Sequence, residues 1–103
     1  MLFYVQMRWN IEGKLNFDEL WDLETKEIEN AQALDQSGKA RAQLYKVAAQ
    51  KRVIGSVDVD SIDELDRTAM GRLPMREYLE FEVVWPLRDY ESFSKDVKAH
   101  YRG

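Results

Sequence analysis

The chain has 103 residues, of which 45% are hydrophobic and 33% charged, with a formal net charge of −4; these values are typical of one globular domain and exclude a disordered chain. Acidic and basic residues are interspersed, so no basic stripe is present for nucleic acid, and no apolar run is long enough to cross a membrane. Cysteine is absent, which excludes disulfides, cysteine-based zinc sites and thiol nucleophiles.

The first predicted element is a strand over residues 2–9. Phe3, Val5 and Met7 alternate with polar or mixed residues, and this period of two is typical of a strand with one apolar face. The same alternation differs from a signal peptide, which needs a basic start followed by a longer apolar run. We therefore expect a soluble, cytoplasmic protein whose first strand ends at the turn residues 10–13.

A long helix is predicted over residues 16–37. Asn16 is a favourable N-cap residue, and the acidic Asp18 and Glu19 suit the positive end of the helix dipole. Gly38 is the residue type that most often ends a helix in the left-handed conformation.

The middle of the chain predicts a hairpin followed by a second helix. Strands are expected over residues 41–49 and 52–59, and the short segment between them favours a tight connection. A second helix is expected over residues 61–71, with Asp60 or Ser61 as its N-cap.

The fourth predicted strand covers residues 78–85 and is expected to end at Pro86, because proline cannot donate a backbone hydrogen bond. Residues 89–101 predict a short amphipathic helix or an ordered tail. The apolar residues of the fourth strand are expected on one face: Leu79, Phe81, Val83 and Trp85.

The order β-α-β-β-α-β predicts an α+β fold of the ferredoxin-like type, with a four-stranded antiparallel sheet and both helices on one face. The other face of this sheet carries a mixture of polar and large apolar residues. Such a face needs a cover, so we expect a second subunit to pack against it.

Two carboxylates interrupt the apolar face of the predicted 16–37 helix. On a helical wheel the apolar residues of this segment lie within one arc of roughly 160°, and Glu24 and Glu27 lie inside the same arc. The residues that define the arc are Phe17, Leu20, Trp21, Leu23, Ile28, Ala31 and Leu34.

A carboxylate that faces an apolar core is costly when ionised, so it finds a partner or its pKa rises. A raised pKa suits a general acid or base near neutral pH, which makes Glu27 the leading candidate for catalysis. Two alternatives remain open for Glu27: an ion pair with a core-facing cation, or a side chain that reaches water at the edge of the arc. The cations considered are Arg8, Arg41 and Lys46.

Other constellations are weaker. Glu24 and Glu27 form half of a metal site at most, since the only histidine, His100, lies in the tail, so no metal is expected. Lys51 and Arg52 form a basic pair at the predicted hairpin. This pair belongs either to a solvated turn or to an anchor for a substrate carboxylate or enolate oxygen.

Short motifs along the chain resemble the muconolactone isomerase family. They include the opening Met-Leu-Phe-Tyr-Val-Gln-Met and a helical glutamate, Glu27, eleven residues before Gly38. Residues 44–48, Leu-Tyr-Lys-Val-Ala, are similar to the family's Leu-Trp-Arg-Ile-Ala strand. Further similar segments are Ser-Val-Asp-Val-Asp-Ser at 56–61, Leu-Pro-Met at 73–75 and Tyr-Leu-Glu-Phe-Glu-Val at 78–83.

The resemblance covers residues 1–87 and implies a ferredoxin-like domain that pairs into a dimeric α+β barrel, often within rings or decamers. Residues 88–103 then form a tail that is expected at the subunit interface. The implied activity is a shift of a double bond in a small, anionic, unsaturated lactone from aromatic-compound breakdown. It requires no cofactor, and the implied pocket lies between the first helix and the sheet.

The resemblance also implies roles for individual residues. Glu27 matches the family's proton-transferring carboxylate, and Lys51 takes the place of a family tyrosine, so that Lys51 and Arg52 are expected to hold the acid or enolate. The other expected pocket residues are Tyr4, Gln6 and Ser56. Because this tyrosine and two family histidines are replaced, a non-catalytic ligand-binding or assembly subunit, a related dehalogenase or lyase, and a monooxygenase-type barrel remain alternatives.

Overall fold

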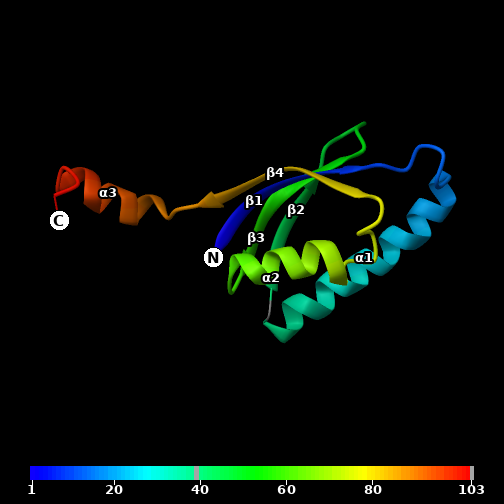
Figure 1. Ribbon diagram of the computed structural model, residues 1–103, viewed down its shortest axis with the longest axis horizontal. Helices are drawn as coiled ribbons and strands as arrows, with labels where there is room; N and C mark the ends of the chain where they lie inside the picture. Colours follow the sequence, from blue (N-terminus) through cyan, green and yellow to red (C-terminus); the bar gives the residue numbers. More distant parts are fainter. Residues whose placement is uncertain (39, 103) are drawn as a thin grey trace.

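The computed structural model describes residues 1–38 and 40–102, and its element order confirms the expected α+β fold (Figure 1). A π-helical turn, η1, is the one element type that the sequence did not predict. The elements are β1 (Leu2–Trp9), α1 (Phe17–Ser37), β2 (Ala40–Lys46), β3 (Arg52–Val59), α2 (Ile62–Arg67), η1 (Thr68–Arg72), β4 (Leu79–Leu87) and α3 (Tyr90–Lys98).

The four strands form one sheet in the order β2-β3-β1-β4, and every neighbouring pair is antiparallel. The helices α1 and α2 pack on the same face of this sheet, as the ferredoxin-like order predicts (Figure 1). We call this the helix face and the opposite one the open face. Helix α3 extends away from the rest of the molecule at the end of β4.

The core lies on the helix face because β1 alternates as predicted. Phe3, Val5 and Met7 are buried and pack with Val59 of β3, while the intervening residues of β1 point to the open face. A second buried cluster lies at the end of β1 and receives α1 through Leu20. Its members are Trp9, Ile11, Leu20 and Met75.

Helix α1 begins and ends where the sequence predicts. Asn16 and Glu19 form a capping box, in which the Glu19 N–H donates to Asn16 Oδ1 at 2.8 Å and the Asn16 N–H donates to Glu19 Oε1 at 3.1 Å. Gly38 adopts the left-handed conformation, with φ 73°, and ends the helix. The apolar arc is wider than the surface in contact with the sheet, and three of its members are exposed: Phe17, Trp21 and Ile28.

The hairpin between β2 and β3 is longer than predicted. Strand β2 ends at Lys46 rather than at residue 49, and the Val47 N–H donates to the Arg52 carbonyl oxygen at 3.0 Å to close the loop. Ala49 has a φ of 62°, a left-handed conformation that a strand residue does not adopt. The turn therefore consumes the residues that the alternation had assigned to the strand.

Strand β4 differs from the prediction in two respects. It continues through Pro86 to Leu87, because β4 is an edge strand, where proline is tolerated. An irregularity in its pairing with β1 between Gln6 and Met7 also changes which face its residues occupy. Phe81 packs on the core, whereas Trp85 stacks on Tyr4 of the open face, with ring centroids 5.4 Å apart.

Helix α2 begins after Ser61, whose side chain accepts from the Glu64 N–H at 3.1 Å and so acts as the predicted N-cap. Beyond Arg67 the backbone widens into η1, in which the Leu73 N–H donates to the Thr68 carbonyl oxygen at 3.1 Å. The predicted 61–71 helix is thus an α-helix followed by a π-helical turn. No helix in the described part of the chain has the length and hydropathy needed to cross a membrane.

Candidate functional site

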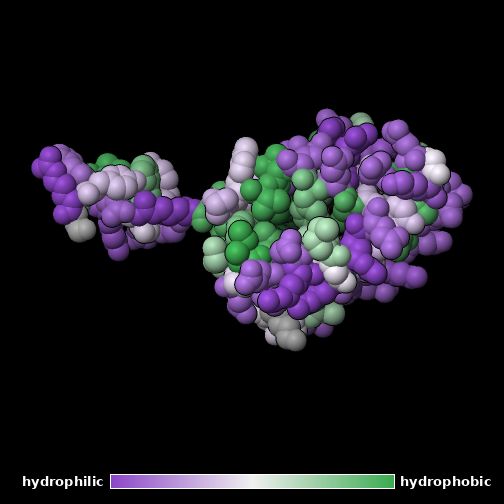
Figure 2. Space-filling model, viewed as in Figure 1, coloured by the Kyte–Doolittle hydropathy of each residue, from purple (hydrophilic) through white to green (hydrophobic). Residues whose placement is uncertain are grey.

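A cavity of about 170 Å³ lies between α1, α2, η1 and the helix face of the sheet. Apolar residues of every element around it form most of its wall, among them Val5, Leu34 and Leu65. Figure 2 shows apolar side chains gathered between β4 and α2, where this interior meets the surface. A cavity of about 150 Å³ accommodates a benzene ring, so this space suits a small ring compound.

Glu27 of α1 lines this cavity and is half-buried. Its Oε2 accepts a hydrogen bond from the backbone N–H of Met75 at 3.0 Å, and no cation forms an ion pair with it among the described residues. Burial raises the pKa of Glu27, and the Met75 hydrogen bond opposes that rise. The structure therefore turns Glu27 toward the interior, without the cation that was considered as an alternative partner.

Glu24 lines the same cavity one helical turn before Glu27. It is half-buried, and neither a hydrogen bond nor an ion pair reaches it from the described residues. Burial, with a smaller contribution from the charge of Glu27, raises the pKa of Glu24 to about 7. Two adjacent carboxyls thus share one apolar space, and only Glu27 receives a donor from the protein.

Asn30, one turn after Glu27, is a third polar residue on this face of α1. Its Nδ2 atom is buried and has no hydrogen-bond partner among the described residues. The sequence analysis did not select Asn30, although its position three residues after Glu27 places it on the same side of the helical wheel. Met75 was also missed, because a backbone N–H contributed by a distant loop leaves no local pattern.

The acidic pair does not extend to a metal site. In the part of the chain that the structure describes, no group of three or more histidine, aspartate or glutamate side chains is suitably placed to hold a metal ion. Glu24 and Glu27 therefore act on each other and on whatever enters the cavity.

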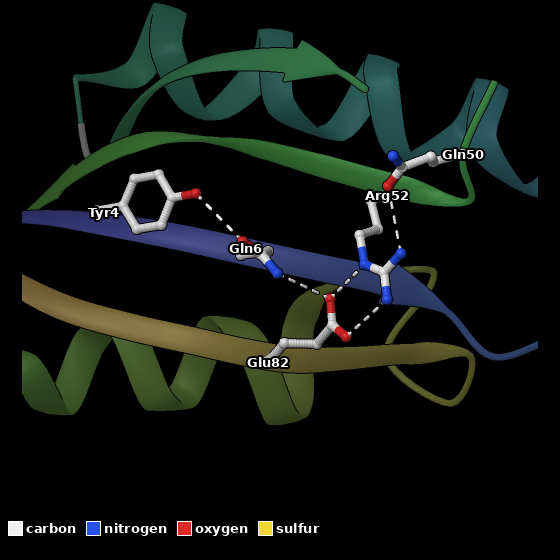
Figure 3. Close-up of polar contacts among 5 residues, drawn as sticks. All are labelled: Tyr4, Gln6, Gln50, Arg52 and Glu82. Carbon is white, nitrogen blue, oxygen red and sulfur yellow. Dashed lines mark hydrogen bonds and ion pairs between the residues drawn. The ribbon is translucent and has the colours of Figure 1, made fainter. Parts of the chain in front are cut away.

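A different polar group crosses the open face of the sheet (Figure 3). Tyr4 Oη donates to Gln6 Oε1 at 3.3 Å, and Gln6 Nε2 donates to Glu82 Oε1 at 3.1 Å. Arg52 donates to both carboxylate oxygens of Glu82, from Nε at 2.9 Å and from Nη2 at 3.2 Å, and from Nη1 to Gln50 Oε1 at 3.2 Å. These bonds from Arg52 lower the pKa of Glu82.

The structure separates most of the predicted pocket residues from Glu27. Tyr4 and Gln6 lie on the open face, and Ser56, the partner of Tyr4 in the pairing of β1 with β3, shares that face. Arg52 joins them there through its bidentate contact with Glu82. The expectation that these four residues line one pocket with Glu27 is corrected, because their positions on β1 and β3 are out of phase with the core residues.

Lys51 also lies outside the cavity of Glu27. Its Nζ is 3.9 Å from Glu12 Oε1 and 5.8 Å from the centre of the Phe17 ring, at the hairpin end of the molecule. Within one chain, Lys51 therefore contacts the start of α1 rather than the middle of the helix, where Glu27 is placed. The juxtaposition of Lys51 and Glu27 that the sequence suggested is not found.

Comparison with known proteins gives two matches. The family model for muconolactone delta-isomerase matches residues 1–93. A structure described as the crystal structure of muconolactone isomerase at 3.3 Å resolution superposes with a TM-score of 0.68 and 30% sequence identity, over 86% of this chain and 91% of that chain. A search of curated proteins gives no match.

Proposed function

The chain belongs to the muconolactone delta-isomerase family, and from this premise we propose that it is a cofactor-free isomerase that moves a double bond in a small unsaturated lactone. The family and the fold support an isomerase of aromatic-compound catabolism. The lactone as substrate, and Glu27 as the group that moves the proton, are our proposals.

The single observation that carries the proposal is the placement of Glu27. Its carboxylate lies in an apolar cavity, one oxygen is held by the Met75 N–H, and the other has no partner among the described residues. A base that is positioned by one hydrogen bond keeps a free oxygen for a substrate proton. Because its pKa is raised, the protonated form is also accessible, as a proton shuttle requires.

The proposed reaction needs one such group and no redox partner. Glu27 removes a proton from a carbon of the lactone, and the electron pair of that C–H bond is delocalised onto the carbonyl oxygen as an enolate. The same carboxyl then returns the proton to another carbon of the conjugated system. A new C–H bond replaces the one that was broken, and the double bond has moved.

Deuterium exchange tests this proposal directly. Muconolactone incubated with the protein in heavy water should take up deuterium, and Glu27→Gln should slow the uptake by about 10²–10⁴-fold, the usual contribution of general acid–base catalysis. Glu29→Gln removes the same charge from an exposed position of α1 and should leave the uptake unchanged. Uptake that is unchanged in Glu27→Gln would exclude Glu27, and no uptake with the unaltered protein would refute the proposed activity.

We propose in addition that the protein is a homo-oligomer in which the open face of the sheet packs on a second copy. This face exposes large apolar side chains, and Trp85 has 59% of its surface exposed. Helix α3 stands apart from its own chain (Figure 1), which supports a domain over residues 1–87 and a tail over residues 88–103 that packs on another subunit. The polar group of Tyr4, Gln6 and Arg52 would then lie between subunits.

A further inference from the structure

An unmatched hydrogen-bond donor lies inside the candidate cavity. A side-chain amide carries two N–H groups, and the Nδ2 atom of Asn30 is buried with neither group bonded to a described residue. Buried polar atoms in native proteins are almost always hydrogen-bonded, and an exception calls for an explanation such as a bound molecule or a catalytic role. Asn30 is the only such side chain in the described part of the chain.

The position of this donor matches the needs of enolate chemistry. Asn30 and Glu27 are three residues apart on α1, so their Cβ atoms are roughly 5–6 Å from each other on one face. Both line the same cavity. A small carbonyl compound placed there can present a C–H bond to the carboxylate while its oxygen reaches the amide.

Neighbouring groups do not supply this donor. Glu24 is acidic, so in its ionised form it would repel the negative charge of an enolate. Lys51 and Arg52, the cations expected for the task, lie at the hairpin and on the open face. Thr68 lines the cavity as well, but no atom of its side chain is buried without a partner.

We propose that Asn30 is a second catalytic residue, whose Nδ2 donates a hydrogen bond to the carbonyl oxygen of the substrate and stabilises the enolate formed when Glu27 removes the proton. When the electron pair of the broken C–H bond moves onto the carbonyl oxygen, the Asn30 N–H holds the developing charge. The charge leaves that oxygen again when Glu27 returns the proton to carbon. This role rests on the proposed function and assigns the electrophilic partner of Glu27.

The replacement Asn30→Leu tests the role, because leucine has a similar shape and no donor. We expect kcat for muconolactone to fall by about 10²–10³-fold, as for the loss of one donor to an oxyanion, with a smaller change in KM. Since the variant removes an unsatisfied buried group, it should be at least as stable as the unaltered protein, so loss of activity does not reflect unfolding. Gln36→Leu, at an exposed position of α1, is the matched control.

A spectroscopic readout separates this role from the proposed reaction. In a Glu27→Gln background, which prevents turnover, the infrared carbonyl band of bound muconolactone should lie at higher wavenumber with Asn30→Leu than with Asn30 present. If muconolactone binds and both its carbonyl band and kcat are insensitive to Asn30→Leu, the role of Asn30 is refuted while the proposed reaction stands. If the unaltered protein neither binds nor converts muconolactone, the proposed function fails and the role of Asn30 fails with it.

Discussion

Glu24 makes the stability of this protein dependent on pH in a predictable direction. Burial in the cavity raises its pKa from 4.5 to about 7, so the folded protein ionises this group at a higher pH than the unfolded chain does. The stability that accompanies protonated Glu24 is complete below pH 4.5 and is lost as the pH rises through about 7. Glutamine has the shape of the protonated acid and does not ionise, so Glu24→Gln should remove the loss.

The size of the effect follows from the pKa. A rise from 4.5 to about 7 corresponds to about 3 kcal/mol at a pH above both values. Because Glu24 is only half-buried, solvent screening reduces the expected gain in the free energy of unfolding to about 1–2 kcal/mol at pH 8. In a domain of this size such a gain raises the midpoint of thermal unfolding by about 5–10 °C.

Thermal and urea unfolding at pH 5 and pH 8, at one protein concentration and one salt concentration, measure this difference. Glu24→Gln should be nearly neutral at pH 5 and stabilising at pH 8. Glu29→Gln removes the same charge from the exposed side of α1 and should show no such increase. Equal gains at both pH values, or equal gains in the two variants, would refute the explanation based on burial of Glu24.

Two further predictions concern the sheet. Gly55→Ala should lower the free energy of unfolding by about 3 kcal/mol in urea titrations, because the added Cβ would lie 2.0 Å from the backbone oxygen of Gln43; Gly71→Ala, with no atom within 4 Å, should have little effect, and equal losses would contradict this reasoning. Trp85→Glu should shift the sedimentation coefficient to that of a monomer, whereas Ile62→Glu, equally exposed on α2, should not; an unchanged assembly in Trp85→Glu would exclude the open face as the interface.

The carboxyl pair suggests a division of tasks at neutral pH. The Met75 N–H favours the ionised form of Glu27, whereas Glu24 receives no donor and has the charge of Glu27 beside it. Two neighbouring carboxyls in an apolar space do not ionise independently, and the one with the better donor ionises first. Protonated Glu24 therefore allows Glu27 to act as the base.

Local patterns in the sequence were sufficient for the elements and for the position of Glu27. The capping box at Asn16, the left-handed Gly38 and the alternation of β1 depend on interactions within a few residues of one another, so they can be read without the rest of the fold. The same holds for Glu24 and Glu27, since helical periodicity alone places both on the face of α1 that meets the sheet.

Only the tertiary structure decided which residues share a cavity. The pairing irregularity opposite Gln6 moved Trp85 to the open face, and the donor to Glu27 comes from Met75, forty-eight residues away. Tyr4 and Arg52 looked suitable by chemistry, but they are separated from Glu27 by the thickness of the sheet. Asn30 became prominent for the opposite reason: whether a buried donor is satisfied depends on every neighbour in space, and spacing along one helix contains no such information.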